Sequence, residues 1–210
     1  YLTKKDMDQP RSLLEQFAAP SKRYRPWPLL ALNDEYPEGS GERRITEILE
    51  NMARVGYGGV FLHARPGLIT EYLSDRWFEV IRHCIAECRR LGMVPGLYDE
   101  NSYPSGFAGG HVPAMSPQTA IKYVTPKFGQ LPALPPQDAL AIYRVEGGVP
   151  IQKMKIEELT QGSEWCAFVM ERMEPLAWHG DFAYTSLLDP QTTKTFLETT
   201  HDRYRSELSD

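Results

Sequence analysis

Three polar clusters in the sequence each follow a short apolar run, and their side chains are of the types that recognise sugars. One cluster begins at Asn33, one holds His63 and Arg65, and one runs from Tyr98 through Tyr103. Carboxylates and guanidinium groups bind hydroxyl pairs with two hydrogen bonds, and aromatic rings cover the apolar face of a sugar. The pattern predicts a carbohydrate site whose substrate-binding residues are Asn33, His63, Arg65, Tyr98, Asp99, Glu100 and Tyr103.

Each cluster also has a plainer interpretation. Asn33 suits an ordinary solvated loop, and His63 suits a core histidine with satisfied ring nitrogens. Asp99 and Glu100 suit a solvated turn, although the proline- and glycine-rich run at 103–110 indicates a tightly shaped loop. Carboxylates also serve glycoside hydrolysis as acid and base, or bind calcium, and spacing alone does not choose among these roles.

The adjacent carboxylates should have different roles. Side chains alternate along a strand, so one of Asp99 and Glu100 is expected to reach the pocket while the other braces the loop. Glu100 is the candidate for the pocket, and the candidate in this chain for a catalytic carboxylate. Trp27 is a further aromatic residue of the sugar-binding type.

The elements that position these clusters follow a regular alternation. Strands are expected near 28–33, 58–63 and 93–98, with amphipathic helices between them that end at Gly56 and Gly92. This spacing is typical of βαβ units and a parallel sheet. No glycine-rich phosphate turn follows the first strand, which favours a barrel over an open dinucleotide-binding sheet. The predicted fold class is α/β, a partial (β/α) TIM-type barrel with its site at the strand carboxyl ends.

After Gly110 the pattern changes to short β-like runs separated by proline and glycine. We expect a small antiparallel β insert after the third strand, because loops of this length rarely lack structure. The predicted organisation is a helical extension, three βα units, a β-rich insert and a return to the barrel with a helix that begins at Pro190. These parts occupy 1–25, 26–117, 118–180 and 181–210.

Composition excludes several classes of function. The net charge is −5 with interspersed signs, so the sequence offers no basic stripe for nucleic acid. No apolar run is long enough to predict a membrane span. The three cysteines lack metal-ligand spacing and read as core residues, so no metal site is predicted. The sequence starts without methionine, which leaves localisation open between a bacterial periplasmic or extracellular setting and the cytoplasm.

Several strings of residues resemble a known family. The segments at 58–68, 71–74, 77–78, 91–93, 98–100 and 104–110 are similar to the large α-L-rhamnosidase-like glycoside hydrolases of the family 106 type. The likeness is strong over about residues 24–110 and returns weakly at 186–190 and 200–204. Where an acidic residue is expected near 185 or 186, this sequence has Thr185 and Ser186.

The resemblance implies a catalytic barrel within a larger protein that has further domains and hydrolyses complex glycans with inversion, aided by calcium. It also implies that the catalytic acid and base lie beyond Asp210, so this chain would be a fragment with binding residues. Two other functions stay open. One is a non-catalytic carbohydrate-binding barrel module, and the other is a metal-dependent sugar isomerase or aldolase, for which only His63 offers a histidine ligand.

Overall fold

The chain is a mixed α/β protein with a parallel sheet of three strands and an antiparallel sheet of four. A computed structural model describes residues 12–209. Its contacts divide the chain into two compact units, one made of Tyr1–Gly109 with Leu197–Asp210 and the other of Gly110–Phe196. The predicted extension at 1–25 lies partly outside the described residues.

The first unit is built on a parallel sheet. Its strands are β1 (Leu29–Leu32), β2 (Gly59–Ala64) and β3 (Val94–Asn101), in the order β1-β2-β3. Leu29 lies beside Phe61, and Phe61 beside Gly96, with both pairings parallel. The prediction of three parallel neighbouring strands is confirmed. Within residues 12–209 this sheet does not close into a barrel.

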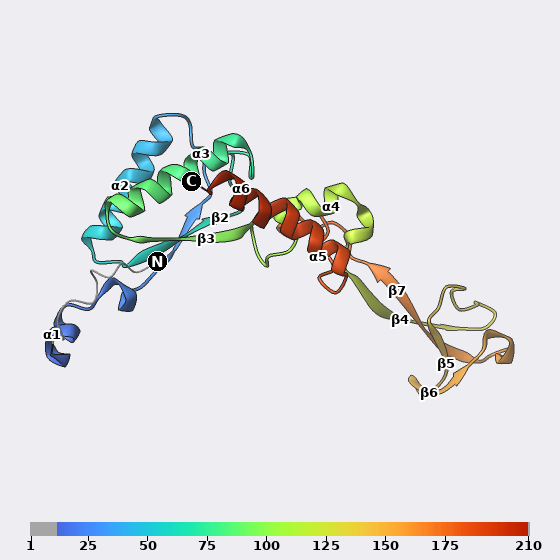
Figure 1. Cartoon of the computed structure of the whole chain (residues 1–210). Helices are drawn as coiled ribbons and strands as arrows, with labels where there is room; N and C mark the ends of the chain where they lie inside the picture. The colour runs from blue at the N-terminus through green and yellow to red at the C-terminus, as the bar shows by residue number, and fades with distance from the viewer. Residues whose placement is uncertain (1–11, 210) are drawn as a thin grey trace. The chain divides into compact units, whose positions relative to one another are not determined.

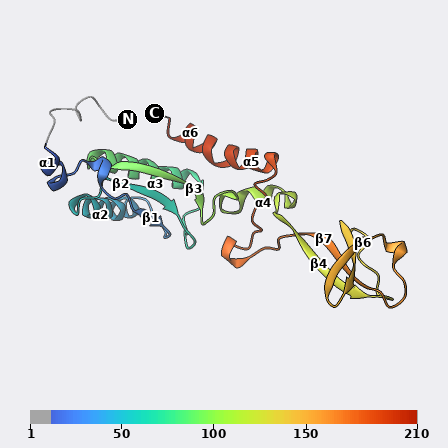
Figure 2. The same ribbon diagram turned by 90° about the horizontal axis from the view of Figure 1, so that it is seen from below.

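Two amphipathic helices cover one face of the parallel sheet (Figures 1 and 2). Helix α2 spans Ser40–Arg54, and helix α3 spans Asp75–Arg90. Ser74 caps α3 by accepting a hydrogen bond from the Trp77 backbone N–H, as the sequence pattern predicts. The buried core between helices and sheet consists of side chains such as Ile45, Leu49, Val60, Leu62, Trp77, Phe78 and Ile81. Burial of these apolar side chains is the main source of stability in this unit.

The last part of a third helical run packs beside α3. It comprises α5 (Pro190–Leu197), a π-helical turn (Glu198–Asp202) and α6 (Arg203–Glu207). The Trp77 indole N–H donates to the Tyr204 hydroxyl at 2.9 Å, and the Tyr204 ring lies edge-on to Phe78. The division between the two units falls at Phe196 and Leu197, inside this run.

The other face of the parallel sheet is partly bare. Leu29 is 59% exposed and Phe61 is 37% exposed. Trp27 packs against Phe61 and close to Gly59, where an added Cβ would lie 2.7 Å from its ring. Because Gly59 begins β2, Trp27 lies at the amino end of the strands. Trp27 is therefore at the opposite end of the strands from the other predicted sugar-binding residues.

The described N-terminal residues form two short helices. Helix α1 spans Leu13–Ala18 and begins at a capping box in which Ser12 and Glu15 exchange hydrogen bonds. A 3₁₀ turn follows at Lys22–Tyr24. The apolar side chains of α1 are exposed, so burial does not hold this helix in place.

The second unit carries an antiparallel sheet in the order β4-β7-β5-β6. Its strands are β4 (Lys122–Gln130), β5 (Ala141–Glu146), β6 (Val149–Met154) and β7 (Glu164–Arg172). These strands lie at the β-like runs that the sequence indicates after Gly110. Short helical segments complete the unit, at Ala108–Gly110 on its boundary and at His111–Met115 (α4), Pro117–Thr119, Ile156–Glu158 and Ala177–His179.

The chain enters and leaves the antiparallel sheet at one place. Ala120 and Thr185 form an antiparallel bridge. The Ile121 N–H donates to the Tyr184 carbonyl at 2.8 Å, and the Ser186 N–H donates to the Thr119 carbonyl at 2.7 Å. These contacts join the two ends of the segment that contains the antiparallel sheet.

Two whole-chain features complete the description. Cys84, Cys88 and Cys166 are free thiols in buried positions, which agrees with their interpretation as core residues. None of the helices in residues 12–209 combines the length and the apolar character needed to cross a membrane.

Candidate functional site at the carboxyl ends of the strands

The carboxyl ends of β1 and β2 lie side by side and carry two of the predicted site residues. The Arg65 N–H donates to the Leu32 carbonyl at 3.2 Å, and Gly67 lies against the backbone of Asn33. Gly67 has a φ of 100°, a conformation that residues with a Cβ rarely adopt. This turn brings the loops that carry Asn33 and Arg65 together.

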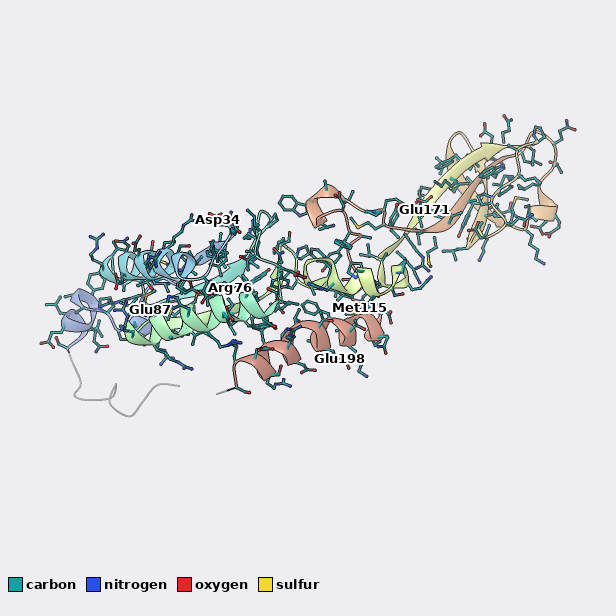
Figure 3. All side chains as sticks on the ribbon, turned by 90° about the horizontal axis from the view of Figure 1, so that it is seen from above. Asp34, Arg76, Glu87, Met115, Glu171 and Glu198 are labelled. Atoms are coloured by element: carbon teal, nitrogen blue, oxygen red, sulfur yellow. The ribbon has the colours of Figure 1, made fainter. Side chains whose placement is uncertain are left out.

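Asp34, next to Asn33, is engaged in a surface ion pair. The Arg44 guanidinium lies 2.5 Å from its carboxylate, and Figure 3 labels Asp34 near the end of β1. The hydrogen bond from Arg44 holds the pKa of Asp34 below its usual value, and the Glu35 backbone N–H acts in the same direction. The loop at Asp34 is therefore charged and exposed to solvent.

His63 joins the end of β2 to the loop after β3. Its side chain is buried, and its Nε2 lies 3.0 Å from the Ser102 carbonyl oxygen. Because a carbonyl only accepts, Nε2 carries the hydrogen. The His63 ring stacks on Tyr98 with 3.8 Å between centroids. Burial lowers the pKa of His63, with a smaller contribution from the Arg65 charge, while the bond to Ser102 opposes them. His63 is thus held as a neutral imidazole that shapes the site.

Glu100 is enclosed by the backbone of its own loop. The side chain is fully buried, and its Oε2 accepts from the N–H groups of Gly106, Phe107 and Ala108 at 2.8 to 3.0 Å. Its Oε1 accepts from the N–H groups of Asn101 and Gly109. Burial raises the pKa of Glu100, and the surrounding N–H groups oppose that rise. All five groups are donors, and a carboxylate matches them because both of its oxygens only accept.

These contacts reverse the expected division of roles between the two carboxylates. Glu100 was the candidate for the pocket and for a catalytic role, but it braces the loop at 105–109 and exposes no surface to a ligand. The physical reason is that the tight loop turns the N–H groups of residues 106–109 inward, where they need a buried acceptor. Asp99 takes the accessible position.

Asp99 is hydrogen-bonded on both carboxylate oxygens. The Ser105 hydroxyl donates to Oδ1 at 2.7 Å, and His201 Nε2 lies 2.8 Å from Oδ2. A third of the Asp99 side-chain surface stays exposed. His201 comes from the π-helical turn, about a hundred residues along the chain, and is not among the predicted site residues. The available signal was its spacing of three residues from Tyr204, which places both on one helical face.

The loop after β3 contains two strained residues. Ser102 has a φ of 112° and Ala108 a φ of 53°, both in a region that favours glycine. The Ser102 hydroxyl and the Asn101 amide oxygen are buried without a hydrogen-bond partner among the described residues. Strain of this kind persists only where surrounding contacts hold it, and it concentrates at functional sites. Tyr103, from the same loop, is 59% exposed, so its ring is available for stacking.

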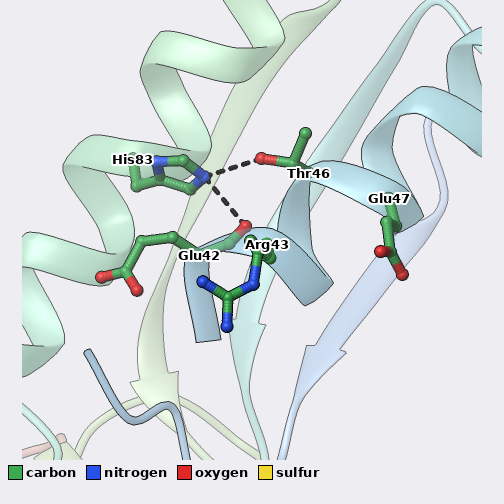
Figure 4. A pocket seen from close by; sticks show the side chains of 5 residues that line it. All are labelled: Glu42, Arg43, Thr46, Glu47 and His83. Carbon is green, nitrogen blue, oxygen red and sulfur yellow. Dashed lines mark hydrogen bonds between the residues drawn. The ribbon is translucent and has the colours of Figure 1, made fainter. Parts of the chain in front are cut away.

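A hollow in the helix layer has a different character. It lies over α2 and α3 and is lined by Glu42, Arg43, Thr46, Glu47 and His83 (Figure 4). His83 Nε2 lies 2.9 Å from the Thr46 hydroxyl and 3.1 Å from the Glu42 carbonyl, so its contacts hold the two helices together. None of the residues predicted for the sugar site lines this hollow, so it is not the candidate site.

The calcium that the resemblance implies was tested against the side chains present. In the part of the chain that the structure describes, no three His, Cys, Asp or Glu side chains gather so that they could hold a metal ion. Glu100 is fully buried and its oxygens accept from five backbone N–H groups, so it has no face to offer a metal ion. These residues do not fit a metal site.

Comparison with known proteins gives little. No known family model matches the chain, and no curated protein sequence matches it. Among solved structures, it is similar to a rhamnosidase from Novosphingobium sp. PP1Y with a TM-score of 0.42 and 20% identity, over 65% of this chain and 15% of that one. The chain therefore spans a small part of that enzyme's length. At this level the likeness carries no argument about function, which must come from the site.

Proposed function

We propose that this chain is part of a glycoside hydrolase built on a (β/α) barrel, and that its strand carboxyl ends bind the sugar. The substrate class is α-L-rhamnosides or related sugars in complex glycans. The observation that carries the proposal is Asp99, a partly exposed carboxylate fixed on both oxygens at the end of a parallel strand. In parallel barrels, residues at this edge of the sheet bind and transform substrates.

Each remaining residue has a role that its surroundings support. Tyr103 offers an exposed ring for the apolar face of the sugar, and Arg65 and Asn33 offer donors from the neighbouring strand ends. His63 and Glu100 shape the site from buried positions. The catalytic acid and base are proposed to lie beyond Asp210.

A non-catalytic carbohydrate-binding module is the second candidate. It uses the same residues, and the observation that favours it is that Glu100 is engaged as a loop brace. Hydrolysis of an aryl α-L-rhamnoside by the longer protein separates the two functions, because a binding module gives none.

The first prediction tests Asp99 in the full-length protein. Asp99→Ala removes a charge-assisted hydrogen bond to sugar worth about 1.5 to 3 kcal/mol, so kcat/KM should fall roughly ten- to a hundredfold. The melting temperature should change far less, because Asp99 is partly exposed. Glu38→Ala, at an exposed position outside the site, is the matched control. Wild-type kinetics in Asp99→Ala would show that the site lies elsewhere.

A further inference from the structure

His201 reaches the candidate site from a helix that follows the third strand only after the antiparallel insert. Its Nε2 lies 2.8 Å from Asp99 Oδ2, and a second group, the Ser105 hydroxyl, holds Asp99 Oδ1. One oxygen is therefore held from the loop and the other from the helix. Ser105 and His201 are distant from each other in the sequence.

The helix that carries His201 is anchored one turn later. Tyr204 is buried, receives a hydrogen bond from the Trp77 indole and packs against Phe78. Residues three apart share a helical face, so this anchor turns His201 toward the sheet rather than away from it. The π-helical turn at Glu198–Asp202 adds a wider turn at this point, a feature that recurs at functional sites.

The hydrogen bonds on Asp99 leave acceptor capacity on both oxygens. An ionised carboxylate offers about four acceptor positions, and Ser105 and His201 occupy one on each oxygen. A carboxylate with one acceptor position left on each oxygen can accept a pair of parallel donors. Two neighbouring hydroxyl groups of a sugar ring supply such a pair.

We infer that His201 is a positioning residue for Asp99, which it fixes with Ser105 so that the carboxylate binds a vicinal diol of a sugar ring. The choice of a diol rests on the proposed function, whereas the positioning of Asp99 does not. His201 acts through Asp99 and needs no contact with the substrate.

The first arm of the test uses the full-length protein without sugar. Long-range ¹H–¹⁵N NMR of the imidazole should show hydrogen on His201 Nε2, and Asp99→Ala should shift that resonance. Arg205→Gln is the control, because Arg205 lies on the same helix and pairs with Asp202. An unchanged His201 resonance in Asp99→Ala would overturn the inference.

The second arm measures the affinity of the same variants for methyl α-L-rhamnopyranoside by calorimetry. His201→Leu should weaken binding about tenfold, whereas His201→Gln, which keeps a donor at similar reach, should stay within roughly threefold of wild type. Equal losses in the two variants, or none in His201→Leu, would contradict positioning through the hydrogen bond. If the first arm succeeds and the full-length wild-type protein binds no sugar, the proposed function falls while the positioning of Asp99 stands.

Discussion

Asp99 and Glu100 are neighbours in sequence with opposite surroundings. The alternation of a strand turns one outward to Ser105 and His201 and the other inward to five backbone N–H groups. The sequence shows that the pair must divide its roles, but not which member is buried. That choice depends on the fold of the following loop, whose N–H groups point at Glu100 only after the loop has closed.

The second prediction concerns Glu100. Glu100→Ala leaves five N–H groups without their acceptor, so it should destabilise the protein by about 3 kcal/mol. Hydrogen exchange at Gly106–Gly109 should accelerate, and added formate should restore part of the protection by filling the space that the carboxylate leaves. The control is Glu38→Ala, which lies at an exposed position. Unchanged exchange in Glu100→Ala would rule out the bracing role.

The third prediction uses the titration of His63. Its folded-state pKa lies below the ordinary value because it is buried, so protonation favours the unfolded chain. The stability that the neutral form supports is present above about pH 6.5 and is lost as the pH falls below it. Urea unfolding from pH 8 to 5 should show this loss, and His63→Gln, which keeps a donor for Ser102, should reduce the slope. Parallel curves for the two proteins would contradict it.

At the scale of elements, the strands and helices of the first unit follow from local patterns. Ser74 and Gly92 mark the ends of α3, and the apolar runs mark β1 to β3. The π-helical turn could not be predicted in this way, because no local pattern at 198–202 distinguishes it from an α-helix. His201 was not predicted as a site residue for a different reason, because its partner Asp99 is distant in sequence.

The fourth prediction tests how the last helix is held. Tyr204→Phe removes the acceptor for the buried Trp77 indole N–H, so the free energy of unfolding should fall by about 1 to 2 kcal/mol. Denaturant unfolding measures this change. Tyr24→Phe is the matched control, because Tyr24 is 72% exposed, and it should change stability by less than about 0.5 kcal/mol. Equal effects of the two substitutions would show that the hydrogen bond contributes nothing.

At the scale of the whole molecule, the parallel sheet of the first unit has two unpaired edges, on β1 and on β3, within the described residues. Phe61 and Leu29 on its bare face and Val94 and Leu97 on β3 are partly exposed. The predicted barrel would pair these edges and cover this face, and it remains a proposal. The predicted boundaries at 25, 117 and 180 also stay predictions, while the contact-defined units divide after Gly109 and Phe196.

The fifth prediction concerns the 210-residue chain expressed alone. It should hydrolyse no aryl α-L-rhamnoside at a useful rate, because the proposed acid and base lie outside it. It should also be poorly soluble, since unpaired strand edges and exposed apolar side chains favour association. Light scattering and a release assay measure both properties. Robust turnover by a monomeric chain would contradict this prediction.

The bridge between Ala120 and Thr185 shortens the loop that the chain must close during folding. Roughly a hundred residues separate Asn101 from His201, and closing a loop costs entropy that grows with the logarithm of its length. Once the antiparallel sheet has formed, the bridge holds Ala120 beside Thr185. The loop between Asn101 and His201 that is left to close is then effectively about a third as long. By that scaling the saving is about 1 kcal/mol. Early formation of the insert would therefore speed the docking of Tyr204 on Trp77, because a shorter loop remains to be closed.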